Sequence, residues 1–172
     1  IYAEIIDEAG YPPGVFNLIQ GDGPTVGAAL SSHEDIQMMS FTGSTRAGID
    51  VSRRAADTVK RVTLELGGKS PNIVFAEADW QRAALESPMS VFANTGQDCC
   101  ARSRMFIEQS IFDDFVSQFV AATEKLNIGN PLLDETQIGP MVSSAQRELS
   151  ESFIAEAKGD GRNILTGGER LS

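Results

Sequence analysis

The alternation of strand-like and helix-like segments in the first 66 residues constrains the fold of this chain more than any other feature. Strand-like patterns cover residues 15–19, 36–41 and 61–66, the first as a buried run and the last with apolar side chains alternating onto one face. Helical patterns lie between them, and the connections are short. This order is typical of a parallel sheet with crossover helices, so the sequence predicts an α/β fold.

Residues typical of helix starts and stops indicate three helices in this first part of the chain. Residues 1–9 place apolar side chains on one helical face, and Gly10 is a natural stop. Residues 24–31 indicate a short helix with Pro24 near its first position. Ser44 is expected to cap a third helix, because small apolar residues then recur at helical spacing.

After Gly67 and Gly68 the alternation starts again. The sequence predicts further strands at residues 73–76, 103–108 and 163–166, and further helices at residues 80–93, 110–125 and 143–158. Pro88 is expected to kink or interrupt the first of these helices. Ser110 and Asp113 have the spacing of a capping box at the start of the second.

The net charge limits which partners the chain can have. Its 172 residues carry 24 acidic and 14 basic side chains, which gives a net charge of −10 at neutral pH. That charge repels polyanions, so we expect no nucleic acid partner and no membrane partner. No apolar run of the sequence is long enough to span a bilayer.

The only two cysteines are adjacent, Cys99 and Cys100. Adjacent cysteines rarely pair, because the geometry of such a disulfide is strained. Two free thiols indicate a reducing, cytoplasmic setting. The pair lacks the spacing of a zinc site and a single histidine cannot complete a ligand set, so no metal is expected.

Both ends of the sequence look cut. The chain starts without a methionine, and its last residues have the composition of a turn. We therefore interpret it as an internal piece of a longer protein, with enough residues for one ordinary domain or for parts of two.

Cys99 is the first candidate for chemistry. A free cysteine is usually a small buried hydrophobe. Gly96, Gln97 and Asp98 are turn formers, however, and they predict a loop in which the Cys99 thiol can act as a nucleophile. His33 is expected to be solvent-exposed in a polar connection, although spacing alone allows it to pair with Cys99 as in a thiol protease.

Glu65 is the second candidate. A glutamate in the exposed row of a half-buried strand is usually only solvated, and its functional interpretation is a general base. Gly67 and Gly68 follow it directly. They remove bulk and allow another backbone or a ligand to approach closely.

Two segments that join a strand to a helix are candidate phosphate sites. The first contains Gly23 and Gly27, but its spacing differs from the dinucleotide fingerprint, and a plain tight turn is the competing interpretation. The second contains Phe41, Gly43 and Ser44. It leads into a helix whose first backbone N–H groups suit an anionic oxygen, and an ordinary N-cap at Ser44 is compatible with that role.

At these residues the chain resembles the aldehyde dehydrogenase superfamily. The motif L-E-L-G-G-K-S-P at residues 64–71 and the motif G-Q-x-C at residues 96–99 are specific to that family. The interval between Glu65 and Cys99 is also the one usual in the family. The resemblance implies the later part of a Rossmann-type parallel sheet over residues 1–66, and the front part of an α/β catalytic domain over residues 67–172.

The resemblance also implies a reaction, the NAD(P)-dependent oxidation of an aldehyde to a carboxylic acid. Cys99 would form a thiohemiacetal and then a thioester, and Glu65 would activate the hydrolytic water. The Cys99 backbone N–H would be one donor to the oxyanion. The residues that would hold NAD or NADP are Gly23, Gly27, Phe41, Gly43, Ser44 and Gln146. A capping box with Ser143 explains Gln146 without any function.

Further expectations follow from the resemblance. The full-length protein would form a homodimer or a homotetramer, and the fragment alone would be inactive. Two other classes stay open, a cofactor-independent thiol hydrolase or thioesterase and a non-catalytic relative. The two phosphate-type segments speak against the hydrolase, since a hydrolase does not need them, and the presence of Glu65 and Cys99 speaks against the non-catalytic relative.

Overall fold

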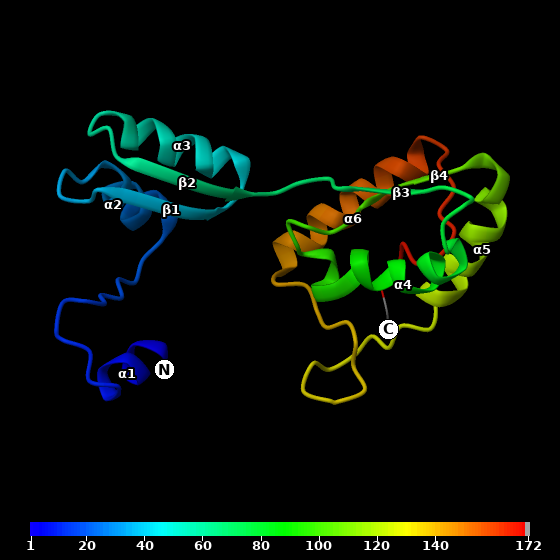
Figure 1. Cartoon of the computed structure of the whole chain (residues 1–172), viewed down its shortest axis with the longest axis horizontal. Coiled ribbons are helices and arrows are strands. Elements are labelled where there is room, and N and C mark those ends of the chain that lie inside the picture. Colours follow the sequence, from blue (N-terminus) through cyan, green and yellow to red (C-terminus); the bar gives the residue numbers. More distant parts are fainter. Residues whose placement is uncertain (171–172) are drawn as a thin grey trace. The chain divides into compact units, whose positions relative to one another are not determined.

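A computed structural model describes residues 1–170, which separate into two compact units (Figure 1). The first unit is Ile1–Gly67, and the second begins at Gly68. Each unit contains a pair of parallel strands with helices beside it. The predicted α/β class and the parallel pairing are therefore confirmed.

The first unit contains two strands, with four helical segments before and between them. In chain order these are α1 (Tyr2–Glu8), η1 (Gly23–Gly27), α2 (Ala28–Ser32), β1 (Met38–Gly43), α3 (Thr45–Ala56) and β2 (Arg61–Leu66). Strands β1 and β2 pair in parallel, and α3 covers one face of the pair (Figure 1). The strand predicted at residues 61–66 has the observed bounds, and β1 begins and ends two residues later than predicted.

Close packing of α3 against β2 depends on a glycine. A Cβ atom at Gly48 would lie 2.8 Å from Cδ2 of Leu66, so a larger residue would force the leucine side chain to shift. Val51 and Ala55 on the same helix are buried. This face of α3 stabilises the unit by removing apolar surface from water, about 25 cal/mol for each Å².

The second unit contains the remaining elements. They are β3 (Pro71–Val74), α4 (Trp80–Phe92), η2 (Ala93–Gly96), β4 (Arg104–Ile107), η3 (Gln109–Ile111), α5 (Phe112–Thr123) and α6 (Ser144–Gly159). Strands β3 and β4 pair in parallel. The core of the unit lies between this pair and helices α4 and α5, and it is formed by Val74, Ala84, Ile111 and Phe115.

Two predicted strands are wrong. Residues 15–19 and 163–166 form no strand, and their apolar side chains, among them Val15 and Leu165, are exposed. A strand needs a neighbour to pair with its backbone groups. Neither segment pairs with a strand anywhere in residues 1–170, so the apolar composition alone does not produce one.

Pro88 does not interrupt its helix, and the capping box predicted at Ser110 is wrong. Helix α4 continues through Pro88 to Phe92, and the proline ring is fully buried. Proline adopts a helical φ, although inside a helix it removes one backbone hydrogen bond and its ring crowds the carbonyl of the preceding turn. At α5 the N-cap is Ile111, because the Ser110 hydroxyl instead donates to Glu108 Oε1 at 2.7 Å.

Other elements match their predicted type with shifted ends. Strand β3 begins two residues earlier than predicted, and Ser143 caps α6 by accepting a hydrogen bond from the Gln146 N–H at 3.2 Å. Within residues 1–170, no helix combines the length and the apolar character that crossing a membrane requires.

Candidate active site

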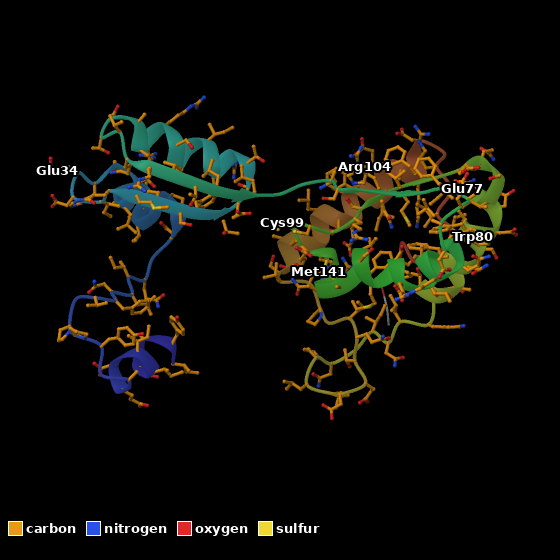
Figure 2. The ribbon with its side chains drawn as sticks, viewed as in Figure 1. Glu34, Glu77, Trp80, Cys99, Arg104 and Met141 are labelled. Carbon is orange, nitrogen blue, oxygen red and sulfur yellow. The ribbon has the colours of Figure 1, made fainter. Side chains whose placement is uncertain are left out.

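Cys99 lies in an exposed loop between η2 and β4, as the sequence predicted (Figure 2). We refer to residues 94–100 as the Cys99 loop. The loop follows the last turn of α4, and Figure 2 shows Cys99 and Met141 at the end of the second unit where α4 ends and α6 begins. The thiol is therefore accessible to a reactant from solvent.

The Cys99 loop begins with an unusual turn. Asn94, Thr95 and Gly96 all have left-handed backbone angles, with φ values of 51°, 61° and 71°. Such angles are uncommon for Asn and a genuine outlier for a β-branched residue such as Thr. A backbone held in this region costs about 1–3 kcal/mol per residue and persists only where neighbouring contacts enforce it.

Side-chain hydrogen bonds enforce the turn. The Asn94 Nδ2 donates to the Gln97 carbonyl at 3.0 Å, and the Gln97 Nε2 donates to the Asn94 carbonyl at 3.0 Å. Two further bonds join the loop to residues 139–142. The Thr95 hydroxyl donates to the Gly139 carbonyl at 2.9 Å, and the Val142 N–H donates to Gln97 Oε1 at 3.0 Å. The sequence predicted no role for Thr95, and it marked Gln97 only as a turn former and a member of the G-Q-x-C motif, not as a contact to residues 139–142.

The neighbours of the Cys99 thiol are acidic. Its Sγ lies 3.7 Å from the Sγ of Cys100, and both thiols are free. The hydrogen bond to Cys100, then the charge of Cys100, partial desolvation and the charge of Asp98 raise the pKa of Cys99 above its ordinary value. Less thiolate is therefore present at neutral pH, and a nucleophilic role calls for a base or a cationic partner.

Asp98, Cys99 and Cys100 also bring one potential metal-ligand atom each to within 4.8 Å of one another. All three residues are exposed. Exposed acidic groups often lie this close without holding an ion, so the expectation of no metal stays a prediction.

Gly68 confirms one part of the sequence interpretation, that a backbone approaches the paired glycines closely. A Cβ atom at Gly68 would lie 3.2 Å from the Cys99 carbonyl oxygen, whereas a Cβ atom at Gly67 would meet nothing within 4 Å. Gly68, the first residue of the second unit, therefore lies against the backbone of the Cys99 loop.

Glu65 lies at the carboxyl end of β2, with its side chain exposed. The parallel register places it beside Thr42 of β1, while Phe41 and Gly43 pair with Leu64 and Leu66. Ligands of open α/β sheets bind at the carboxyl ends of the strands. Glu65 belongs to the first unit and Cys99 to the second.

The two candidate phosphate sites of the first unit differ in their caps. At α3 the Ser44 hydroxyl accepts from the Ala47 N–H at 3.2 Å, so a neutral group caps the helix. At η1 the Asp22 carboxylate accepts from the Thr25 N–H at 2.7 Å, and this bonding lowers the pKa of Asp22. An anion is attracted to a helix N-terminus but repelled by a carboxylate, so the α3 end suits a phosphate better.

The remaining candidate cofactor residues lie in open surroundings. A Cβ atom at Gly23 or at Gly27 would meet nothing within 4 Å, so the protein itself does not require glycine there. Gln146, on the first turn of α6, lines a pocket of about 310 Å³. Thr95 and Gln97 of the Cys99 loop and Met141 and Val142 line the same pocket. His33 accepts a local hydrogen bond from the Asp35 N–H and is exposed.

A comparison with known families decides what kind of protein this chain is part of. The sequence model of the aldehyde dehydrogenase family matches residues 1–172. The chain therefore belongs to the aldehyde dehydrogenase family. The resemblance found in the sequence is confirmed.

Individual relatives agree with this assignment. The chain is 45% identical to mitochondrial aldehyde dehydrogenase from Homo sapiens over 167 residues, which is 96% of this chain and 32% of the human protein. Among solved structures, an NAD-dependent aldehyde dehydrogenase from Sinorhizobium meliloti has a TM-score of 0.95 and 41% identity to this chain. The match covers 99% of this chain and 34% of the Sinorhizobium meliloti protein. Betaine aldehyde dehydrogenase from Staphylococcus aureus, solved in complex with NAD⁺, has a TM-score of 0.94 and 36% identity over 99% of this chain and 34% of its own.

The chain spans about a third of the length of these relatives. That share agrees with the prediction of an internal fragment. The activity, substrate and assembly of the whole protein are therefore matters for a proposal.

Proposed function

We propose that this chain is an internal part of a longer NAD(P)-dependent aldehyde dehydrogenase, and that it supplies the nucleophile, the base and part of the cofactor site. Residues 1–66 would form part of the cofactor-binding domain, and residues 67–172 part of the catalytic domain. The observation that carries the proposal is the accessible Cys99 thiol on a strained, hydrogen-bonded loop, in a chain that belongs to this family.

The residues present suit a dinucleotide. Ser44 leaves the N-terminus of α3 without negative charge, and Gly23 and Gly27 leave open space beside η1. In the proposal Phe41, Gly43 and Ser44 contact the phosphates, and Gln146 contacts a ribose. When bound, the nicotinamide ring of NAD or NADP supplies the acceptor for a hydride. Relatives of this chain have been solved with NAD⁺ or are described as NAD-dependent, which supports NAD as the first cofactor to test.

Cys99 acts first in the proposed reaction. Its thiolate attacks the carbonyl carbon of the aldehyde, which forms a carbon–sulfur bond and a thiohemiacetal oxyanion. The Cys99 backbone N–H is free to stabilise that oxyanion, because it donates to no acceptor within the described part of the chain. Loss of hydride from the same carbon leaves a thioester on Cys99.

Glu65 acts on the thioester. As a general base it removes a proton from water, whose oxygen attacks the thioester carbonyl and releases the carboxylic acid and the Cys99 thiol. Its exposed position at the carboxyl end of β2, beside the segment proposed for the cofactor, supports this role. The raised pKa of Cys99 gives the same base a second use, the activation of the thiol.

Several finer points belong to the proposal as well. The substrate is an aldehyde, the location is a reducing compartment such as the cytoplasm, and the full-length protein is a homodimer or homotetramer. The human relative is described as mitochondrial, so the location needs its own measurement.

The test uses the full-length protein that contains this chain. Mixed with an aldehyde and NAD⁺, it is expected to produce the absorbance of reduced nicotinamide, and rapid quenching followed by peptide mass spectrometry is expected to find the acyl group on Cys99. Cys99→Ala abolishes both signals while cofactor binding persists, and Cys100→Ala keeps both. Acylation of Cys99 by an activated ester or thioester, with no nicotinamide reduced in the presence of an aldehyde, would instead identify a cofactor-independent thiol hydrolase.

A further inference from the structure

We propose that Thr95 and Gln97 are positioning residues for Cys99, which they hold in place by joining its loop to residues 139–142. We refer to the two hydrogen bonds, Thr95 hydroxyl to Gly139 carbonyl at 2.9 Å and Val142 N–H to Gln97 Oε1 at 3.0 Å, as the loop clamp. The catalytic part of this inference rests on the function proposed above. Its structural part does not.

The backbone of the Cys99 loop is the reason a clamp is needed. Asn94 and Thr95 adopt left-handed angles that other conformations of the chain would relieve. The turn determines the direction in which the chain leaves α4, four residues before Cys99. If the turn relaxed, the thiol would move with it.

The two bonds act at both ends of the turn. Thr95 is itself the strained residue, and its own hydroxyl contacts the distant segment, with a second and longer contact of 3.4 Å to the Pro140 carbonyl. Gln97 uses its Oε1 for the distant Val142 and its Nε2 for Asn94 within the loop. Each side chain therefore joins local loop geometry to a segment more than 40 residues away in the sequence.

The clamp also places the loop beside α6. Residues 139–142 lead into the N-cap of α6 at Ser143, and Thr95, Gln97 and Gln146 line the same pocket. A shift of about 1 Å in a reacting group can lower a catalytic rate about a hundredfold, so the position of this loop matters more than its contribution to stability.

The decisive comparison is Thr95→Val against Thr95→Ser in the full-length protein. Valine keeps the shape and loses the hydroxyl, whereas serine keeps the donor. We expect Thr95→Val to lower kcat/KM for the aldehyde about tenfold to a hundredfold with KM for the cofactor changed less than about twofold, and Thr95→Ser to stay close to wild type. Gln97→Met, which loses both side-chain bonds, is a second variant with the same expected direction.

Hydrogen exchange gives a readout that needs no activity. Amides of residues 139–142 are expected to exchange faster in Thr95→Val, and those of residues 94–100 faster in Gln97→Met, while thermal unfolding shows that each variant is folded. Thr123→Val is the matched control, since the Thr123 hydroxyl donates only within α5, to the Phe119 carbonyl at 2.8 Å.

Two results would overturn the clamp. One is unchanged exchange and unchanged kcat/KM in both Thr95→Val and Gln97→Met, and the other is Thr95→Ser behaving like Thr95→Val. If the wild-type protein oxidises no aldehyde, the proposed function fails, and the exchange experiment still decides whether the clamp exists.

Discussion

The backbone of Gly68 lies against the Cys99 carbonyl, so closely that a Cβ atom on Gly68 would lie 3.2 Å from that oxygen. The neighbouring Gly67 has open space at the same position. Two adjacent glycines in one motif therefore have different reasons to be glycine. Gly68 allows its own backbone to lie close to the Cys99 carbonyl, and a side chain at this position would press on the Cys99 loop.

Gly68→Ala tests that contact, with Gly67→Ala as the matched control. At 3.2 Å the added methyl group is too close to a backbone oxygen, so the Cys99 loop must shift by a few tenths of an ångström. We expect kcat/KM for the aldehyde to fall about tenfold in Gly68→Ala because the nucleophile is displaced. Steady-state kinetics showing equal losses in both variants would contradict this account.

The reactivity of Cys99 should depend on its acidic neighbours. The hydrogen bond to Cys100 and, after it, nearby negative charge disfavour the thiolate, which is why Cys100 and Asp98 raise the pKa of Cys99. Removing either neighbour should lower that pKa. In a plot of alkylation rate against pH, the increase caused by the Cys99 thiolate should therefore begin at a lower pH in Cys100→Ala and in Asp98→Asn than in wild type. Peptide mass spectrometry of iodoacetamide-treated protein across a pH series measures the rate of Cys99 alkylation. Asp113→Asn on α5 serves as the control.

Ser44 has two possible roles that substitution can separate. As the N-cap of α3 it stabilises the helix, and Ser44→Ala should cost about 1 kcal/mol of unfolding free energy. Ser44→Asp keeps a good cap but brings a negative charge to the proposed phosphate site. We expect its stability to stay close to wild type while KM for the cofactor rises several-fold. Unchanged cofactor binding in Ser44→Asp would leave Ser44 with the capping role alone.

Substitution of Gly27 should change the stability of the protein and its affinity for the cofactor in opposite directions. Its backbone is right-handed helical, with φ −62°, and an added Cβ atom meets no other atom within 4 Å. Gly27→Ala should therefore stabilise the free protein slightly, by up to about 1 kcal/mol, because alanine favours helix. If the cofactor passes over this residue, its dissociation constant should rise in the same variant, as isothermal titration calorimetry would show.

Glu65→Gln distinguishes the base from a solvated surface carboxylate. The amide cannot accept a proton from water, so the acyl enzyme should form but hydrolyse slowly. A burst of reduced nicotinamide followed by a steady state slowed about a hundredfold is the expected result in stopped-flow measurements. Glu124→Gln, a glutamate at the end of α5 outside the site, should behave like wild type, and a wild-type steady state in Glu65→Gln would remove Glu65 from the mechanism.

The sequence was most informative where a local pattern matches a local structure. The strand at residues 61–66 and the caps at Ser44 and Ser143 depend on neighbours within a few positions, and the structure confirms them. Residues 15–19 were predicted wrongly because a strand depends on a partner elsewhere in the chain, which no local pattern reveals. Ser110 was predicted wrongly because Glu108 competes successfully for its hydroxyl.

In the candidate site, too, some features could be predicted from local sequence and others depend on tertiary contacts. The sequence alone determined the α/β class, the family and the exposed position of Cys99, because these follow from periodicity, motif spacing and the polar turn formers around the thiol. Only the tertiary structure decided that Thr95 and Gln97 contact residues 139–142, and that Gly68, unlike Gly67, faces the Cys99 carbonyl. Those contacts join residues about 30 to 45 positions apart, and folding brings such residues together only when the whole unit packs.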